Sequence, residues 1–259
     1  MIQVENLYKN YGKIKAVQNL SLVIHPGEIY GFLGPNGAGK TTTIKILTGL
    51  LLPTSGKVKV GGFDIVHESK YAKQITSLIP DRPYVYEKLT PIEYLNFLSG
   101  IYQLNRHDSQ NISLKYLDLF GLMRWKDELI EGFSHGMKQK VVMAGALLTQ
   151  PKILIIDEPM VGLDPQSAKL VKEIFNQLAK QGLTILLSTH TLDIVEDLCA
   201  RIGIIRSGEL IAEGSLSELR TRAKNSNGNL EEIFLQFTGE TDIQKKLEYL
   251  NNQTSNINV

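Results

Sequence analysis

The chain has 259 residues, a formal net charge of +1 at pH 7 and a single cysteine. This charge balance excludes the strongly basic footprint of a nucleic-acid or anionic-lipid binder, and one cysteine excludes an internal disulfide. The apolar runs at 153–156 and 183–187 are strand-length and too short to span a bilayer, and the N-terminus lacks the layout of a signal peptide. The sequence therefore predicts a soluble protein that needs a partner for any work at a membrane.

The chain opens with alternating patterns typical of antiparallel strands, at 2–7 and 17–24. Between them lies Tyr11, directly before a glycine. An aromatic ring in this position can stack on a purine base, and such stacking contributes roughly 1–3 kcal/mol. A tyrosine in an antiparallel sheet more often packs against its neighbours, so this segment alone favours packing for Tyr11.

A glycine-rich turn follows, between an apolar strand at 28–33 and a helical pattern at 42–50. It fits G-x-x-x-x-G-K-[ST], the phosphate-binding loop of nucleotide hydrolases. Its glycines let backbone amides converge on a phosphate, Lys40 offers an ammonium to the outer oxygens, and the Thr41 hydroxyl suits Mg²⁺. The predicted nucleotide-binding residues are Gly34, Pro35, Asn36, Gly37, Ala38, Gly39, Lys40, Thr41 and Thr42. We expect this loop to bind a nucleoside triphosphate.

The middle of the chain is helical and is predicted to be an insertion near 84–150. Residues 90–93 (Thr-Pro-Ile-Glu) predict a helix start with a capping box. The polar stretch 105–111 is expected to precede a second amphipathic helix that extends to Leu122. A third helix is expected after 133–136.

Two carboxylates, Asp157 and Glu158, end the continuously apolar strand at 152–156. Open α/β sheets place their chemistry at such strand ends. Successive side chains of an extended chain point in different directions, so Asp157 can hold magnesium while Glu158 deprotonates a water for attack on the γ-phosphate. His190 follows the next strand, at 183–187. A lone histidine there is usually structural, but its position after the acidic pair favours a functional role.

After His190, apolar residues at helical spacing predict a helix that includes Ile202. The residues around 207–208 predict a hairpin, and its first strand also includes Ile202. A short appendix then covers 215–259. Within it we expect a polar break at 225–229 and a frayed end at 251–259.

Taken in order, these motifs resemble the ATP-binding subunits of ABC transporters, from the first strand to about residue 214. The matching residues are Tyr11 as the adenine platform, 34–42 as the phosphate loop, Ser134 and Gly136 in the signature, Asp157 and Glu158 ending the acidic strand, Asp164 in the D-loop, and His190 as the switch histidine. The resemblance reverses the interpretation of Tyr11, because the family has its adenine-stacking aromatic at that place.

The resemblance implies a P-loop NTPase fold: a RecA-like α/β core, an antiparallel β subdomain and an inserted α-helical subdomain, with an ATPase domain at 1–214. It implies ATP and Mg²⁺ as cofactors. It also implies a head-to-tail dimer, as a homodimer or with a second ATP-binding subunit, in which each ATP lies between one phosphate loop and the other chain's signature. Transmembrane permease subunits would be the partners, and the chain would be cytoplasmic and peripheral on the inner face of the membrane.

Some residues depart from the family pattern. His135 and Met137 stand in the signature where Gly and Gln are common. Asp81 stands where the family usually has the Q-loop glutamine. It could still reach magnesium or the attacking water, and its charge beside Asp157 and Glu158 should raise a carboxylate pKa.

The segment at 81–90 resembles that of subunits serving ABC-2-type exporters. The family docks the coupling helix of its permease there, and Tyr84 and Tyr86 would suit such an interface if exposed. The alternative is that both tyrosines pack within the hinge of the helical part.

Three functions remain open from the sequence. The first is the ATPase subunit of an exporter. The second is a soluble ABC-type ATPase acting on nucleic acid or ribosomes, which the near-zero net charge disfavours. The third is a nucleotide sensor without turnover, prompted by Asp81 and the unusual signature.

Overall fold

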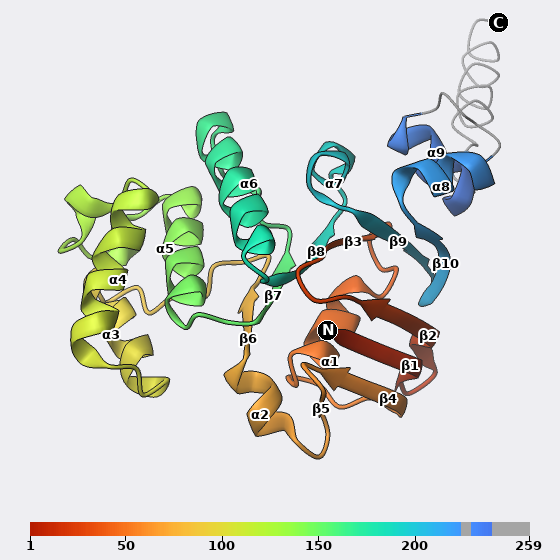
Figure 1. Ribbon diagram of the computed structural model, residues 1–259, viewed down its shortest axis with the longest axis horizontal. Helices are drawn as coiled ribbons and strands as arrows, with labels where there is room; N and C mark the ends of the chain where they lie inside the picture. Colours follow the sequence, from red (N-terminus) through yellow and green to blue (C-terminus); the bar gives the residue numbers. More distant parts are fainter. Residues whose placement is uncertain (224–228, 240–259) are drawn as a thin grey trace, which may run out of the picture.

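Two β-sheets organise the computed structural model, which describes residues 1–223 and 229–239 (Figure 1). Strand order is β2-β1-β4-β5 in an antiparallel four-stranded sheet and β10-β9-β3-β8-β7-β6 in a mostly parallel six-stranded sheet. The first sheet contains β1 (Ile2–Tyr11), β2 (Ile14–Ile24), β4 (Ser55–Val60) and β5 (Phe63–Asp64). The second contains β3 (Ile29–Leu33), β6 (Thr76–Ile79), β7 (Ile153–Asp157), β8 (Thr184–Thr189), β9 (Arg201–Arg206) and β10 (Glu209–Gly214).

The central strands of the six-stranded sheet are wholly buried, as their continuous apolar pattern predicts. Their side chains alternate between two cores. Leu154 and Ile156 face the cluster that includes helices α5 (His135–Leu148) and α6 (Pro165–Lys180), while Ile153 and Ile155 face the cluster around α1 (Lys40–Leu47). The sheet is therefore covered on both faces, and its carboxyl edge is where the polar residues of β7 and β8 emerge.

A group of helices lies beside β6, on the left in Figure 1. It is formed by α3 (Pro91–Ile101), α4 (Arg106–Leu119), α5 and the short 3₁₀ turns η1 (Met123–Trp125) and η2 (Ile130–Gly132), whereas α2 (Ser69–Gln74) precedes β6. The capping box of α3 is confirmed, because Thr90 Oγ1 accepts from the Glu93 amide and Glu93 Oε2 accepts from the Thr90 amide. The limits 84–150 and 1–214 stay predictions.

Four boundaries, in three helices, differ from expectation. α4 begins at Arg106, inside the stretch expected to precede it, because the Asn105 side chain accepts from the amides of His107 and Asp108 and caps the helix. The helix ends at Leu119, so Leu122 lies beyond it. α7 (Leu192–Leu198) ends before Ile202, which belongs to β9, and α5 begins at His135, inside the motif expected to precede it.

The hairpin β9–β10 turns at 207–208 as predicted, and it is followed by α8 (Leu216–Arg222) and α9 (Leu230–Thr238). Leu219 of α8 and Ile233 of α9 are buried in one cluster with Leu33 of β3 and Ile204 of β9. These helices therefore cover the β9 side of the sheet, at the upper right of Figure 1. The polar break at 225–229, except Asn229, and the end at 251–259 lie outside the described residues.

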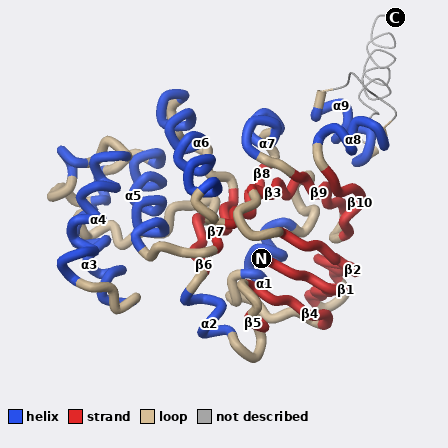
Figure 2. Tube along the Cα trace, viewed as in Figure 1, coloured by secondary structure: helices blue, strands red, loops and turns tan. Residues whose placement is uncertain are grey.

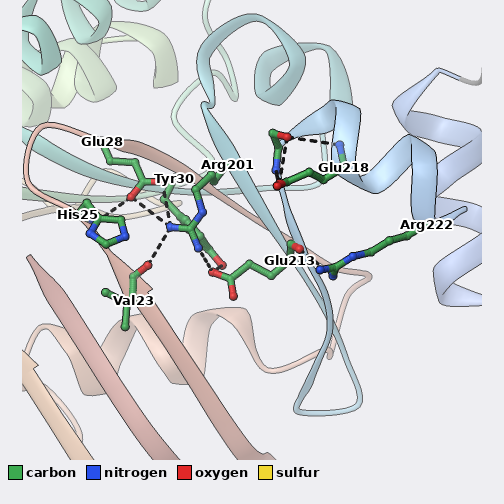
Figure 3. A network of polar contacts seen from close by, with 9 residues as sticks. Val23, His25, Glu28, Tyr30, Arg201, Glu213, Glu218 and Arg222 are labelled. Carbon is green, nitrogen blue, oxygen red and sulfur yellow. Dashed lines mark hydrogen bonds and ion pairs between the residues drawn. The ribbon is translucent and has the colours of Figure 1, made fainter. Parts of the chain in front are cut away.

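Arg201 joins the two sheets (Figure 3). Its guanidinium donates to the Val23 carbonyl at 3.1 Å, to Glu28 at 3.2 Å and to Glu213 at 2.6 Å. The Tyr30 hydroxyl also donates to Glu213, at 3.0 Å. The hairpin is thus fixed to β2 and β3 at its base.

Candidate nucleotide site

The phosphate loop leaves β3 and enters α1 at the carboxyl edge of the sheet. Gly39 is the N-cap of α1 with φ of 108°, a left-handed conformation that favours glycine, and a Cβ there would lie 2.5 Å from the Ala16 carbonyl. The α1 N-terminus therefore begins within the predicted loop. A helix start with free amides stabilises a phosphate, which fits the role predicted for 34–42.

Lys40 closes the loop over its own backbone. Its Nζ donates to the carbonyls of Gly34 at 2.6 Å and Pro35 at 3.2 Å, and the residue is only 8% exposed. Burial lowers the pKa of the Lys40 ammonium, while the carboxylates of Glu158 and Asp157 oppose that change. The Lys40 ammonium is therefore held by loop carbonyl groups, and a phosphate group can take their place as its hydrogen-bond acceptor.

Asp157 is the last residue of β7 and is buried. The Thr41 hydroxyl donates to its Oδ2 at 3.1 Å. Burial raises the pKa of the Asp157 carboxyl, and the charges of Asp81 and Glu158 raise it further. The direction fits the predicted crowding of carboxylates, although burial is the larger cause and the hydrogen bond from Thr41 opposes the rise in pKa.

Glu158 and His190 are brought together by adjacent parallel strands, in which Asp157 pairs with Ser188. Oε1 of Glu158 accepts from the His190 amide at 2.9 Å and lies 2.7 Å from His190 Nδ1. Oε2 accepts from the Thr189 hydroxyl at 2.8 Å. Thr189 did not stand out in the sequence; the only signal was its place directly before His190.

Asp81 and Tyr11 are predicted site residues with exposed side chains outside the Lys40 and Glu158 contacts. Asp81 is exposed in the loop after β6, near enough to affect the pKa of Asp157. Tyr11 ends β1 with 47% of its surface exposed, and Lys9 Nζ lies 5.1 Å from its ring centroid. With 47% of its surface exposed, Tyr11 fits either role, so the packing that the local sequence favoured and the adenine stacking both stay predictions.

The signature motif forms the start of α5. Ser134 is the N-cap and accepts from the Met137 amide at 3.3 Å. Gly136 is buried, and a Cβ there would lie 2.3 Å from the Gly162 carbonyl. The exposed His135 packs its ring against Gly162. The signature therefore touches the D-loop of its own chain, which follows Glu158 closely.

Asp164 is the N-cap of α6 and accepts from the Ser167 amide at 2.9 Å and the Ser167 hydroxyl at 2.5 Å. These hydrogen bonds lower the pKa of Asp164. Lys140 Nζ lies 3.9 Å from its carboxylate. Asp164 thus caps α6 and lies near the start of α5, which carries Ser134 and Gly136. These three residues come from other segments of the chain than Lys40 and its phosphate loop.

The residues predicted to hold Mg²⁺ are Thr41, Asp157 and Asp81. Within residues 1–223 and 229–239, no group of three or more His, Cys, Asp or Glu side chains is arranged to hold a metal ion. Mg²⁺ fits nevertheless, because it is commonly bound by one or two carboxylates together with substrate phosphates. The buried Asp157 carboxylate, bonded to the Thr41 hydroxyl, is a donor set of that kind.

Comparison with known proteins decides what this site belongs to. The family model for ABC transporters matches residues 17–161. The linearmycin resistance ATP-binding protein LnrL of Bacillus subtilis is 41% identical over 222 residues, which cover 86% of this chain and 71% of that protein. The chain belongs to the ABC transporter family. This ABC protein is also 39% identical to NatA of Bacillus subtilis, over 83% of the chain and 88% of NatA.

Solved structures agree with that assignment. An ATP-binding subunit of an ABC transporter matches 92% of this ABC protein and 99% of its own chain with a TM-score of 0.88 and 32% identity. The cassette MJ0796, solved as a dimer in a post-hydrolysis state with ADP and Pi, matches with a TM-score of 0.77 and 25% identity over 83% and 99% of the two chains. The P-loop NTPase fold is therefore confirmed.

The chain is an ATP-binding subunit that hydrolyses ATP to power a transporter, and the family acts as dimers together with transmembrane subunits. Within the described residues, no helix combines the length and the apolarity needed to cross a membrane.

Proposed function

We propose that this chain is the ATPase subunit of an export-type ABC transporter and that Glu158 is its general base. The main support is the position of the Glu158 carboxylate, which His190 and Thr189 hold beside Lys40 and Asp157. A carboxylate with both oxygens engaged has a fixed orientation, as a group that must align and deprotonate water requires.

Each residue at the carboxyl edge then has a role. Lys40 leaves the carbonyls of its loop to bind outer phosphate oxygens, and His190 orients Glu158 and contacts the transferred phosphoryl group. Tyr11 stacks on the adenine. Thr41, Asp157 and Asp81 would hold Mg²⁺, which neutralises charge on the phosphates when bound.

We assign the second half of each nucleotide site to another ATP-binding subunit. Ser134 caps a 14-residue helix and Gly136 lies in its first turn, and the positive end of this helix suits the γ-phosphate of an ATP held by the partner. Asp164 lies near this helix through Lys140 and would join the interface. The cassettes solved as dimers support this arrangement. Loss of the γ-phosphate would reopen the dimer.

The permease would dock between the core and the helical group. An open groove of about 120 Å³ there is lined by residues that include Leu78, Leu98 and Tyr102, and a neighbouring one of about 230 Å³ shares Leu78 and Tyr102. Beyond them, Tyr84 is 75% exposed, which disfavours packing as its role. Tyr86 is 59% exposed and contacts the Phe97 ring edge-on, so it serves packing in part. Such a partner would hold the chain on the cytoplasmic face of a membrane.

Export is supported by the names of relatives. Besides LnrL, the probable multidrug ABC transporter ATP-binding protein YbhF of Escherichia coli is 34% identical over 93% of this chain, which spans 42% of YbhF. An acidic residue at position 81 also fits the exporter resemblance.

Dimerisation of Glu158→Gln tests the proposal. We expect this variant to bind ATP, to release no phosphate above background and to remain a dimer in light scattering, because the site closes but water is not activated. Glu128→Gln, at an exposed carboxylate outside the site, is the control and should turn over normally. A Glu158→Gln protein that stays monomeric with saturating MgATP would contradict the dimer.

Copurification of an apolar membrane protein with the tagged chain tests the permease assignment.

A further inference from the structure

Three consecutive residues near the start of α5 contact two other parts of the chain. Lys138 Nζ contacts Glu87 Oε1 at 2.5 Å, and Gln139 Nε2 donates to the Pro80 carbonyl at 3.4 Å. Lys140 Nζ lies 3.9 Å from Asp164. The helix that begins with the signature is therefore connected to the loop after β6 and to the D-loop at once.

The connection to the loop after β6 extends along the backbone. The Glu131 amide donates to the Glu87 carbonyl at 2.9 Å, and the Ile130 amide donates to the Leu89 carbonyl at 3.0 Å. Lys88 also forms an ion pair with Glu131. Figure 2 shows this segment as a loop between β6 and α3. It is held near both ends, at Pro80 and at 87–89, while Tyr84 remains largely exposed between them.

The Lys138–Glu87 pair is partly shielded from water, since the two side chains are 17% and 54% exposed. Partly exposed pairs of this kind contribute little to folding stability. Gln139 is fully buried, and its Oε1 has no hydrogen-bond partner among the described residues. A buried amide used only in part is a costly way to stabilise a fold. Lys138 and Gln139 are better explained by the position that they impose on the loop after β6.

We infer that Glu87 and Lys138 are positioning residues that make segment 81–87 move together with the signature helix. ATP bound at Ser134 and Gly136 would then change the exposed surface at Tyr84 and Tyr86, and a protein docked there would act on the signature by the same path. The inference rests on the proposed dimer. It adds an ion pair, formed between residues 51 apart in the chain, to the residues that serve hydrolysis.

The test uses the 259-residue chain carrying Glu158→Gln and measures backbone hydrogen exchange with and without MgATP. With the native pair, ATP should slow exchange both at 134–139 and at 84–87. In Glu87→Lys and in Glu87→Gln, ATP should still slow exchange at 134–139, while its effect at 84–87 falls by at least about 2-fold, the lower end of the coupling between contacting residues. The swap Glu87→Lys with Lys138→Glu should restore the response at 84–87.

A matched control is the pair Lys172–Asp197, which lies 2.6 Å apart with side chains 25% and 60% exposed. Asp197→Lys should leave both responses as they are. The inference is overturned if 84–87 responds to ATP equally in the Glu87 variants and the native pair, or if the swap restores nothing while 134–139 remains protected. An absence of any ATP effect at 134–139 in every variant would instead remove the dimer, and the inference with it.

Discussion

Oε1 of Glu158 faces both the backbone amide and Nδ1 of His190, at 2.9 and 2.7 Å. The side chain of His190 is 62% exposed, whereas that of Glu158 is 16% exposed. His190 thus holds the carboxylate from its solvent side. These contacts fix the orientation of the carboxylate that we propose as the general base.

Replacing His190 by alanine should separate binding from hydrolysis. The amide of residue 190 and the Thr189 hydroxyl would still bind Glu158, so the fold should persist, but one oriented contact is lost. We expect phosphate release in a single turnover to fall by about 10²–10³-fold, with ATP affinity changed by less than about threefold. His107→Ala, at an exposed residue of α4, is the control. A His190→Ala protein with normal turnover would contradict this role.

Replacing Lys40 by alanine should remove ATP binding. A buried ammonium that exchanges loop carbonyls for phosphate oxygens makes charge-assisted contacts that no other side chain of the loop can supply. We expect ATP affinity to fall by about 100-fold or more, measured by calorimetry. Lys45→Ala, at an exposed position of the same helix, should bind ATP normally. Equal affinities of the two variants would sink the assignment.

Replacing Tyr11 by alanine should lower the affinity for ATP by about 5- to 150-fold, which corresponds to the loss of about 1–3 kcal/mol of stacking. Tyr11→Phe should retain most of the affinity, because the ring and not the hydroxyl makes the contact. The ring is half exposed, so Tm should change little in the absence of nucleotide. A large drop in Tm with unchanged affinity would favour the packing role instead.

Asp157→Asn should stabilise the nucleotide-free protein at neutral pH. Burial raises the pKa of Asp157 in the folded state, so the folded state binds the proton more tightly than the unfolded one. The resulting destabilisation is absent below the unfolded pKa and complete above the folded pKa. We expect a higher Tm at pH 7.5, by about 2–4 °C per kcal/mol, and no advantage near pH 4. A lower Tm at pH 7.5 would contradict this sign. Hydrolysis should be lost.

Asp81→Ala should slow partner-stimulated turnover more than it weakens ATP binding. Asp81 is exposed and acts on the buried Asp157 carboxyl through its charge, so we expect it to act on magnesium or water without holding the nucleotide itself. Stimulated and basal rates, with ATP affinity measured in parallel, provide the comparison. Asp127→Ala is the exposed-carboxylate control. Unchanged stimulation in Asp81→Ala would exclude this residue as a substitute for the Q-loop glutamine.

Local signals predicted most of the architecture. The phosphate loop, the capping box at Thr90 and the buried strand ending in Asp157 each depend on neighbouring residues, so the sequence displays them directly. The start of α4 was missed because its first turns are polar and a single side chain, Asn105, sets its boundary. The excess length predicted for α7 came from an apolar residue, Ile202, that fits a helix pattern and a strand equally well.

The site was predictable in composition but not in its contacts. Lys40, Asp157, Glu158 and His190 are recognisable by type and order, whereas the pairing of Glu158 with His190 depends on strand register. Contacts between distant segments, such as Lys138 with Glu87 and Gly136 with Gly162, leave no periodic trace in the sequence. They depend on how the helical group sits against the core.

The burial of α8 and α9 affects how the protein can be handled. Shortening the chain at residue 214 would uncover Leu33 and Ile204, which Leu219 and Ile233 now shield from water. The Arg201 network would survive, since its partners Val23, Glu28 and Glu213 all precede the cut. A protein shortened in this way would keep its two sheets joined but expose an apolar surface. Self-association through that surface would resemble ATP-driven dimerisation in a size measurement.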